Sequence, residues 1–312
     1  VFTLFCLSYK KTITPSYYFV VLLLVTIYVP FSTLYAFSSF SSMFYYQVTF
    51  LFFILVLIQK TKRVKVPVLN APRWALDCFL VILVLITLSF IFYSFYKMGF
   101  RLNYDLKLLY QVRAVFHDTI ANGLLGYLFT LTTKSILIFF MGFSLFKKKY
   151  FYFLFFMACE VFIAGMANHK AIFLYPFLVL FFYLILLKRI SSASIIFLFL
   201  SIVLIGNLFS FFGYDRFSII FILRMFFMTV LNDYQYYIFF QDNPFTYFSN
   251  SFFGNFIEYP YKESIPEIIG YGRWSEDVAA FANTGIFGSG YMHMGFIGML
   301  FFTLILSVIF KF

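Results

Sequence analysis

Apolar residues run in long blocks along this chain, and short polar stretches separate the blocks. A helix needs about 20 mostly apolar residues to cross the hydrocarbon core of a bilayer. Eight blocks approach or exceed that length: 17–37, 41–58, 75–96, 121–145, 150–166, 171–187, 194–212 and 291–310. With residues 1–8 as the end of an earlier helix, the pattern predicts an all-α polytopic membrane protein of about 8–9 transmembrane helices.

The composition also indicates that lipid surrounds most of the protein. Hydrophobic residues make up 63% of the 312 positions and charged residues 11%, whereas about a quarter of the residues in a soluble domain are charged. Because so few charges could not cover a water-exposed surface, lipid must solvate most of the helices. Both ends fall in or beside apolar runs, as expected of a single transmembrane domain, residues 1–312, that is truncated at both ends.

Basic residues mark one side of the predicted membrane domain. If Lys10 and Lys11 face the cytoplasm, 13 of the 23 Lys and Arg residues do so, and Asp77 is their only acidic neighbour. Short cytoplasmic loops carry an excess of Lys and Arg, so this asymmetry sets the orientation. It also accounts for the net charge of +11 without nucleic acid as a partner.

Two longer stretches then fall on the external side. In residues 97–120, Leu106, Leu109 and Arg113 recur at helical spacing, which predicts an interfacial helix. Residues 213–290 are far longer than a connector, and loops of that length are usually functional. Their first part, residues 217–231, is apolar but too short to cross, so we expect re-entrant or surface helices in this large external loop.

Five of the eight arginines lie on this external side. The guanidinium group keeps its charge and donates two parallel hydrogen bonds, which suits a phosphate or diphosphate ligand. The alternative is that each arginine extends to a lipid headgroup. The five residues are Arg101, Arg113, Arg216, Arg224 and Arg273.

Polar residues also occur in and between the two short predicted helices 150–166 and 171–187. His169 and Lys170 lie in the turn between them, where they would line a cavity or contact headgroups. Glu160 lies inside the first of them, as a neutral packing residue, a counter-ion of Lys134 or a cavity-lining residue.

Glu276 and Asp277 are adjacent carboxylates in the large loop, and either could act as a general base. The chain has no Asp-x-Asp pair, no glycine loop for nucleotide phosphates and no histidines at metal-ligand spacing. We therefore expect no metal and no cofactor.

Residues 277–300 resemble the O-antigen polymerase family, which joins lipid-linked oligosaccharide repeat units. The likeness rests on an Ala-Asn-Thr-Gly…Gly-Tyr…Gly-x-Ile-Gly stretch, on Tyr110-x-x-Arg113 before Gly126-Tyr127-Leu128, on the His169-Lys170 turn, and on the run from Arg224 to the Asn-Pro near Phe248. It covers roughly residues 100–310, and His293 departs from the small or amide residue expected there.

The resemblance implies a GT-C-type architecture and a metal-independent glycosyltransferase at the periplasmic face of the bacterial inner membrane. Its donor would be an oligosaccharide on undecaprenyl diphosphate, and its partners would include a chain-length regulator and a flippase. The implied roles are as follows: Arg113, Lys170, Arg216, Arg224 and Arg273 bind the diphosphate; His169, Glu276 and Asp277 are catalytic; Asn283, Thr284, Tyr291 and His293 shape the sugar site.

Two other functions stay open at this point. An O-antigen ligase would use the same donors but would transfer to a core oligosaccharide. A flippase or transporter of lipid-linked oligosaccharide is expected to have repeat-related bundles and short loops, which this sequence does not show.

Overall fold

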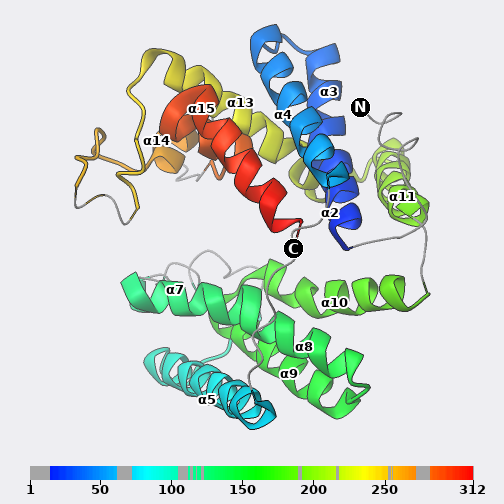
Figure 1. Cartoon of the computed structure of the whole chain (residues 1–312), viewed down its shortest axis with the longest axis vertical. Coiled ribbons are helices and arrows are strands. Elements are labelled where there is room, and N and C mark those ends of the chain that lie inside the picture. The colour runs from blue at the N-terminus through cyan, green and yellow to red at the C-terminus, as the bar shows by residue number, and fades with distance from the viewer. Residues whose placement is uncertain are drawn as a thin grey trace. The chain divides into compact units, whose positions relative to one another are not determined.

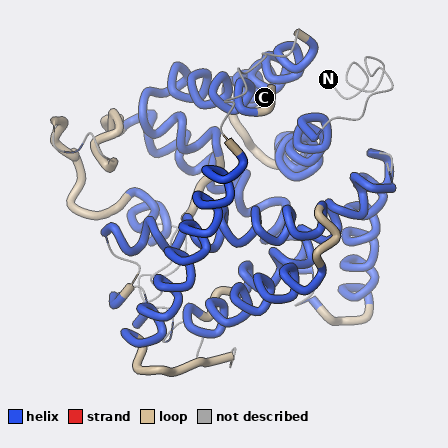
Figure 2. Tube along the Cα trace, turned by 60° about the horizontal axis from the view of Figure 1, so that its bottom comes forward, coloured by secondary structure: helices blue, strands red, loops and turns tan. Residues whose placement is uncertain are grey.

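The computed structural model describes the chain in segments, and every regular element in them is helical (Figures 1 and 2). The described residues are 15–61, 72–104, 112, 115–116, 118–120, 123–188, 192–215, 218–251, 254, 256–271 and 282–311. The sequence predicts one transmembrane domain, whereas the chain packs as two compact units. Unit 1 is Val1–Pro67 with Ser191–Phe312, and unit 2 is Val68–Ile190.

Unit 1 combines the first helices of the chain with the last ones. α2, η1 and α3 follow one another without a gap, η1 being a π-helical turn, and η3 likewise leads directly into α13. The elements are α2 (Pro15–Leu23), η1 (Leu24–Tyr28), α3 (Val29–Phe37), α4 (Ser42–Lys60), α11 (Ser192–Phe211), η3 (Ser218–Phe227), α13 (Met228–Asp242), α14 (Ile265–Tyr271) and α15 (Ile286–Ile309). The most extensive packing between described helices of this unit is that of α13 against α15.

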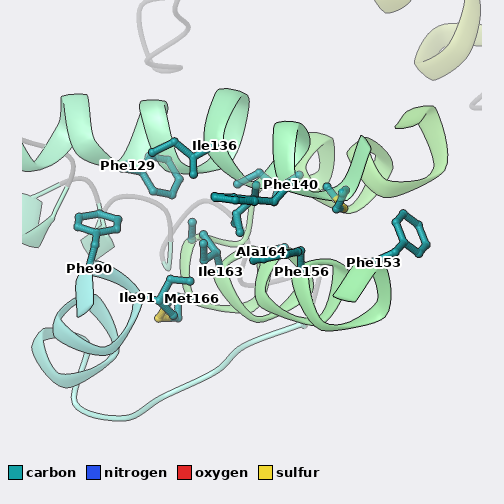
Figure 3. Close-up of a cluster of buried hydrophobic side chains, with 14 of the residues drawn as sticks. Phe90, Ile91, Phe129, Ile136, Phe140, Phe153, Phe156, Ile163, Ala164 and Met166 are labelled. Atoms are coloured by element: carbon teal, nitrogen blue, oxygen red, sulfur yellow. The ribbon is translucent and has the colours of Figure 1, made fainter. Parts of the chain in front are cut away.

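Unit 2 is built from the middle of the chain. Its elements are α5 (Arg73–Lys97), α7 (Gly123–Leu131), η2 (Thr132–Ile136), α8 (Leu137–Phe146), α9 (Tyr150–Ala167) and α10 (Lys170–Lys188). Figure 3 shows Phe156, Ile163 and Ala164 of α9 directed toward the helix that carries Ile136 and Phe140. These residues form a continuous apolar core inside the unit.

The helices occupy the eight positions that hydropathy predicts. Among the described residues, six helical stretches are long and apolar enough to span a membrane, and two shorter apolar helices lie at Ile172–Leu184 and Ile196–Phe211. Membrane crossing by these two stays a prediction. α5 shows why lipid is needed, because only 17% of the residues in its apolar stretch are buried inside the protein. Such a broad apolar surface is not stable in water.

α15 differs from the predicted span 291–310. It begins earlier, at Ile286, and its backbone leaves the helical region at Met294 (φ −151°, ψ 27°) and Gly295 (φ 61°, ψ −141°). The left-handed φ at the second position is one that glycine adopts without cost. α15 is therefore a broken helix with two separate pieces.

Glycines let the two pieces of α15 pack so closely that their backbones are in contact. A Cβ placed on Gly290 would lie 2.7 Å from the Cα of Met299, and one on Gly298 would collide with the carbonyl oxygen of Gly290. No side chain fits between the pieces at this point.

Segment 213–290, predicted as a loop with surface or re-entrant helices, contains η3, α13 and α14. Most of the predicted interfacial helix in 97–120, including Leu106, Leu109 and Arg113, lies outside the described residues. Phe116 and Ile120 are described and buried. They belong to the apolar core of unit 2, whereas Val115, Asp118 and Thr119 are exposed, so this part of the segment packs one face on the unit and leaves the other open.

Candidate functional site

A buried carboxylate on α13 caps the start of α15. Asp233 is 2% exposed, and its Oδ1 accepts hydrogen bonds from the backbone N–H groups of Gly285 (2.6 Å) and Gly288 (3.1 Å). The Thr284 hydroxyl donates to the same oxygen. The first N–H groups of a helix lack partners within it and carry partial positive charge. Asp233 therefore acts as the N-terminal cap of α15, although it belongs to a different helix.

Two glycines make this approach possible. A Cβ on Gly288 would lie 2.8 Å from Asp233 Oδ1, and one on Gly285 would lie 2.9 Å from Oδ2. Both distances are shorter than any ordinary contact of a Cβ atom. The Thr284-Gly285…Gly288 sequence is therefore shaped to receive the carboxylate.

The environment of Asp233 suits proton exchange. Burial raises the pKa of its carboxyl group to about 6, although the hydrogen bonds from Thr284, Gly285 and Gly288 lower it. All three of these bonds go to Oδ1. No described residue donates to Oδ2.

Three of the predicted sugar-site residues contact α13, which carries this carboxylate. Thr284 contacts it directly, and the backbone carbonyl of Asn283 accepts a 2.7 Å hydrogen bond from the Asn232 side chain. The Asn283 side chain itself is exposed. The ring centroid of Tyr291 lies 4.9 Å from that of Tyr237. The structure thus brings Asn283, Thr284 and Tyr291 to one face of α13.

The fourth predicted sugar-site residue, His293, lies at the break of α15 and is buried. Its Nδ1 accepts the backbone N–H of Phe248 (3.2 Å) and lies 2.8 Å from the Thr246 hydroxyl. Since a backbone N–H can only donate, Nδ1 is the unprotonated nitrogen and Nε2 carries the hydrogen. The Phe248 ring stacks on the imidazole with a centroid distance of 4.1 Å.

Residues 246–248 also satisfy the backbone at the break. The N–H of Thr246 donates to the Met292 carbonyl (3.0 Å), and that of Tyr247 donates to the His293 carbonyl (3.3 Å). A broken helix is tolerated in an apolar environment only where its freed polar groups find partners. These contacts give His293 a structural role, and its predicted contact with a sugar stays a prediction.

The predicted phosphate-binding and catalytic residues fall in both units or outside the described residues. Arg224 is exposed on η3 in unit 1, and Lys170 begins α10 in unit 2 with its side chain outside the described residues. His169 belongs to unit 2, where its ring lies 6.1 Å from that of Phe129 between centroids. Also outside the described residues are Arg113, Arg216, Arg273, Glu276 and Asp277.

The turn that holds His169 is tightly built. Asn168 ends α9 in the left-handed conformation, with φ 47°, and the N–H of Asn103 donates to the carbonyl of Gly165 (2.9 Å). Segment 101–104 therefore lies against the last turn of α9. This arrangement keeps polar groups together at one end of unit 2.

Glu160 is buried in α9 without the partner that the sequence suggested. Both of its carboxyl oxygens lack a hydrogen bond in the described structure, and Lys134 is exposed. The interpretation of Glu160 as a counter-ion of Lys134 is therefore wrong. Among the described residues, no three His, Cys, Asp or Glu side chains could hold a metal ion together.

Sequence reasoning missed Asp233 because the residue counted only as one acidic residue of a long loop. A local signal was present, since Val230, Asp233, Tyr237 and Phe240 recur at the spacing of one helix face. A carboxylate among apolar residues of such a face must be capped, paired or protonated. Recognising a helix at 228–242 would have identified it.

The broad lipid-facing surfaces and the helical fold define an all-helical, multi-pass membrane protein. No family model, curated protein or solved structure matches the chain.

Proposed function

We propose that the protein is a polymerase of the bacterial inner membrane that joins undecaprenyl-diphosphate-linked oligosaccharide repeat units at the periplasmic face. The observation that carries the proposal is the buried Asp233 carboxylate at the start of α15, beside Asn283 and Thr284. This carboxylate is bound to the Asn-Thr-Gly stretch on which the resemblance to O-antigen polymerases rests.

In the proposed reaction, a sugar hydroxyl of the incoming repeat unit attacks the anomeric carbon of the donor glycan. Oδ2 of Asp233 takes the hydroxyl proton, a new glycosidic bond forms, and the bond from the anomeric carbon to the diphosphate oxygen breaks. Undecaprenyl diphosphate leaves with the electron pair of that bond. Asp233 thus takes the role of base first assigned to Glu276 or Asp277.

Cations are needed where the diphosphate departs, because negative charge builds up on the leaving oxygen. Arg224 is the described residue proposed for this role, and its side chain is exposed on η3. The other residues proposed to bind the diphosphate are Arg113, Lys170, Arg216 and Arg273, with His169 helping the leaving group.

Substituting Arg224 by alanine is expected to shorten or abolish the polymer without removing the protein from the membrane. Loss of one such donor typically costs on the order of 3–4 kcal/mol of transition-state stabilisation, or several-hundred-fold in rate. Arg224→Lys keeps a charge but not the two-pronged donor and should recover only part of the activity. Glycan length on gels, with immunoblots of membrane fractions, measures both effects. Unchanged polymer in Arg224→Ala would exclude this arginine from the site.

The rate of transfer should depend on pH through Asp233. The base must be ionised, and burial raises the pKa of its carboxyl group to about 6. The rate should therefore fall about tenfold per pH unit below about 6 and level off above it. Initial rates with purified protein and lipid-linked repeat units measure this profile, and Glu258→Gln, which removes an exposed carboxylate, is the control. A flat profile between pH 5 and 7 would contradict the assignment.

Deleting the gene tests the function as a whole. If the deletion leaves single repeat units on the lipid that normally carries the finished glycan, the gene encodes a polymerase. If it leaves polymer on undecaprenyl diphosphate, the gene encodes a ligase. Restoration of long polymer by the full-length gene completes the test.

Transport of lipid-linked oligosaccharide is the second candidate, and the break in α15 favours it. Transporters bind substrates at discontinuous helices whose ends face the ligand, and α15 is discontinuous at Met294 and Gly295. A lost flippase would leave repeat units on the cytoplasmic side and reduce all surface glycan, both long and short. The deletion strain therefore distinguishes this outcome as well.

A further inference from the structure

The Glu160 carboxyl group has no use in the mechanism proposed above. Its side chain is completely buried, and neither Oε1 nor Oε2 has a hydrogen-bond partner in the described structure. Buried polar groups are nearly always hydrogen-bonded, and the exceptions require an explanation. A carboxyl group with two unpartnered oxygens in a membrane-spanning helix is such an exception.

Ring contacts on both sides fix the depth of Glu160 within unit 2. One turn earlier on α9, Phe156 stacks on Phe140 of α8 with a centroid distance of 4.9 Å. Two residues later, Phe162 packs on Phe95 of α5 at 4.8 Å. Glu160 shares the face of α9 that carries Phe156, Ile163 and Ala164, which Figure 3 shows directed toward α8. The carboxyl group is therefore inside the helix packing.

No charged group on the neighbouring helices faces it. α8 contains no Asp, Glu, Lys or Arg, and those of α5 and α10 lie at their ends. Lys134, on η2, is exposed. The nearest titratable neighbours are Cys159 and Tyr175 of α10, which lie within electrostatic range of Glu160.

An ionised carboxylate in this environment would be very costly. Removing the charge from water is strongly unfavourable unless a partner compensates. A metal cation would need several oxygen ligands, and no described oxygen bonds to this carboxyl group. A proton needs no further ligand, so only protonation makes the observed packing favourable.

Polar groups gather at the end of α9 that follows Glu160. A Cβ on Gly165 would lie 2.6 Å from the Tyr104 hydroxyl, so this hydroxyl rests on the helix backbone. Gly165 is five residues from Glu160, roughly 7–8 Å along the axis. Asn103 is bonded to the same glycine, and the turn containing Asn168 and His169 follows.

We propose that Glu160 is a proton-binding site that exchanges protons with water through the end of α9 that carries Tyr104 and the Asn168-His169 turn. Release of the proton leaves a charge that the closed packing cannot hold. Ionisation is therefore linked to separation of α9 from α8 and α10, and unit 2 changes conformation with proton binding. This inference goes beyond the proposed function and does not depend on it.

Dicyclohexylcarbodiimide, an apolar reagent that reacts with protonated carboxyl groups, tests the site in the purified full chain. We expect modification of Glu160, seen by peptide mass spectrometry, to slow at least tenfold as the pH rises by several units. Glu160→Gln should remove the modified peptide, and Glu258 is the exposed carboxyl group for comparison. Tyr104→Ala removes the ring over Gly165 and should speed modification severalfold.

Three results would overturn the proposal. If Glu160 reacts only after the protein is unfolded, it is a packing residue that does not exchange protons with water. Modification that does not change with pH would show that the proton is not exchanged. Modification slowed by sodium ions at constant pH would show that an alkali cation occupies the site. An unchanged rate in Tyr104→Ala would overturn the assigned route. None of these results depends on polymerase activity, so the proposed function is tested separately.

Discussion

Replacing Asp233 by asparagine is expected to abolish glycan polymerisation while the protein still folds. The amide oxygen can keep accepting from Gly285, Gly288 and Thr284, as Oδ1 does now, but the amide cannot take a proton from the acceptor sugar. Loss of a general base costs typically 10²–10⁴-fold in rate. Initial rates with lipid-linked repeat units, normalised to protein in the membrane, measure the effect.

Asp242→Asn is the matched control, because it removes an exposed carboxylate from the same helix and should leave the rate unchanged. Asp233→Ala should lose both activity and stability, since three donors lose their acceptor and each buried unpaired group costs about 1–3 kcal/mol. A folded Asp233→Asn protein with normal activity would show that the carboxylate only caps α15.

Gly298→Ala is expected to have the largest effect on stability. The new Cβ would collide with the backbone carbonyl of Gly290, and neither backbone piece can move aside as a flexible side chain could. Overpacking of this kind costs typically 1–3 kcal/mol and more where the backbone must shift. Thermal unfolding in detergent, followed by helical circular dichroism, should show a clear loss of Tm.

Gly142→Ala provides the comparison within unit 2. No atom lies within 4 Å of a Cβ built on Gly142, which is inside α8, and alanine favours a helix over glycine by about 1 kcal/mol. The variant should therefore be as stable as the original or slightly more stable. Equal behaviour of the two variants would mean that the two pieces of α15 do not pack closely.

Hydropathy located the helices well because a bilayer requires about 20 apolar residues in each span, and this requirement is visible in one sequence. α4 and α9 were predicted to within about two residues at either end. The start and the break of α15 were not predicted, because Met294 and Gly295 lie inside an apolar run. Hydropathy reports which solvent a residue prefers but not the direction of the backbone.

The candidate site was predicted in part. Asn283, Thr284 and Tyr291 were identified from a sequence motif, and the structure places them against α13. Asp233 lies 51 residues from Thr284, so only folding brings the two together. Its burial depends on Gly285 and Gly288 leaving space, and a single sequence does not show which glycines serve this purpose.

The break in α15 also limits how far this element extends through a bilayer. The piece that follows Gly295 ends at Ile309, so it spans roughly 20 Å at 1.5 Å per residue, whereas the hydrocarbon core is about 30 Å thick. A segment this short either thins the surrounding bilayer or leaves its upper end submerged. In the second case, the break and the His293 side chain beside it would lie below the headgroup level, where water competes least for their hydrogen bonds.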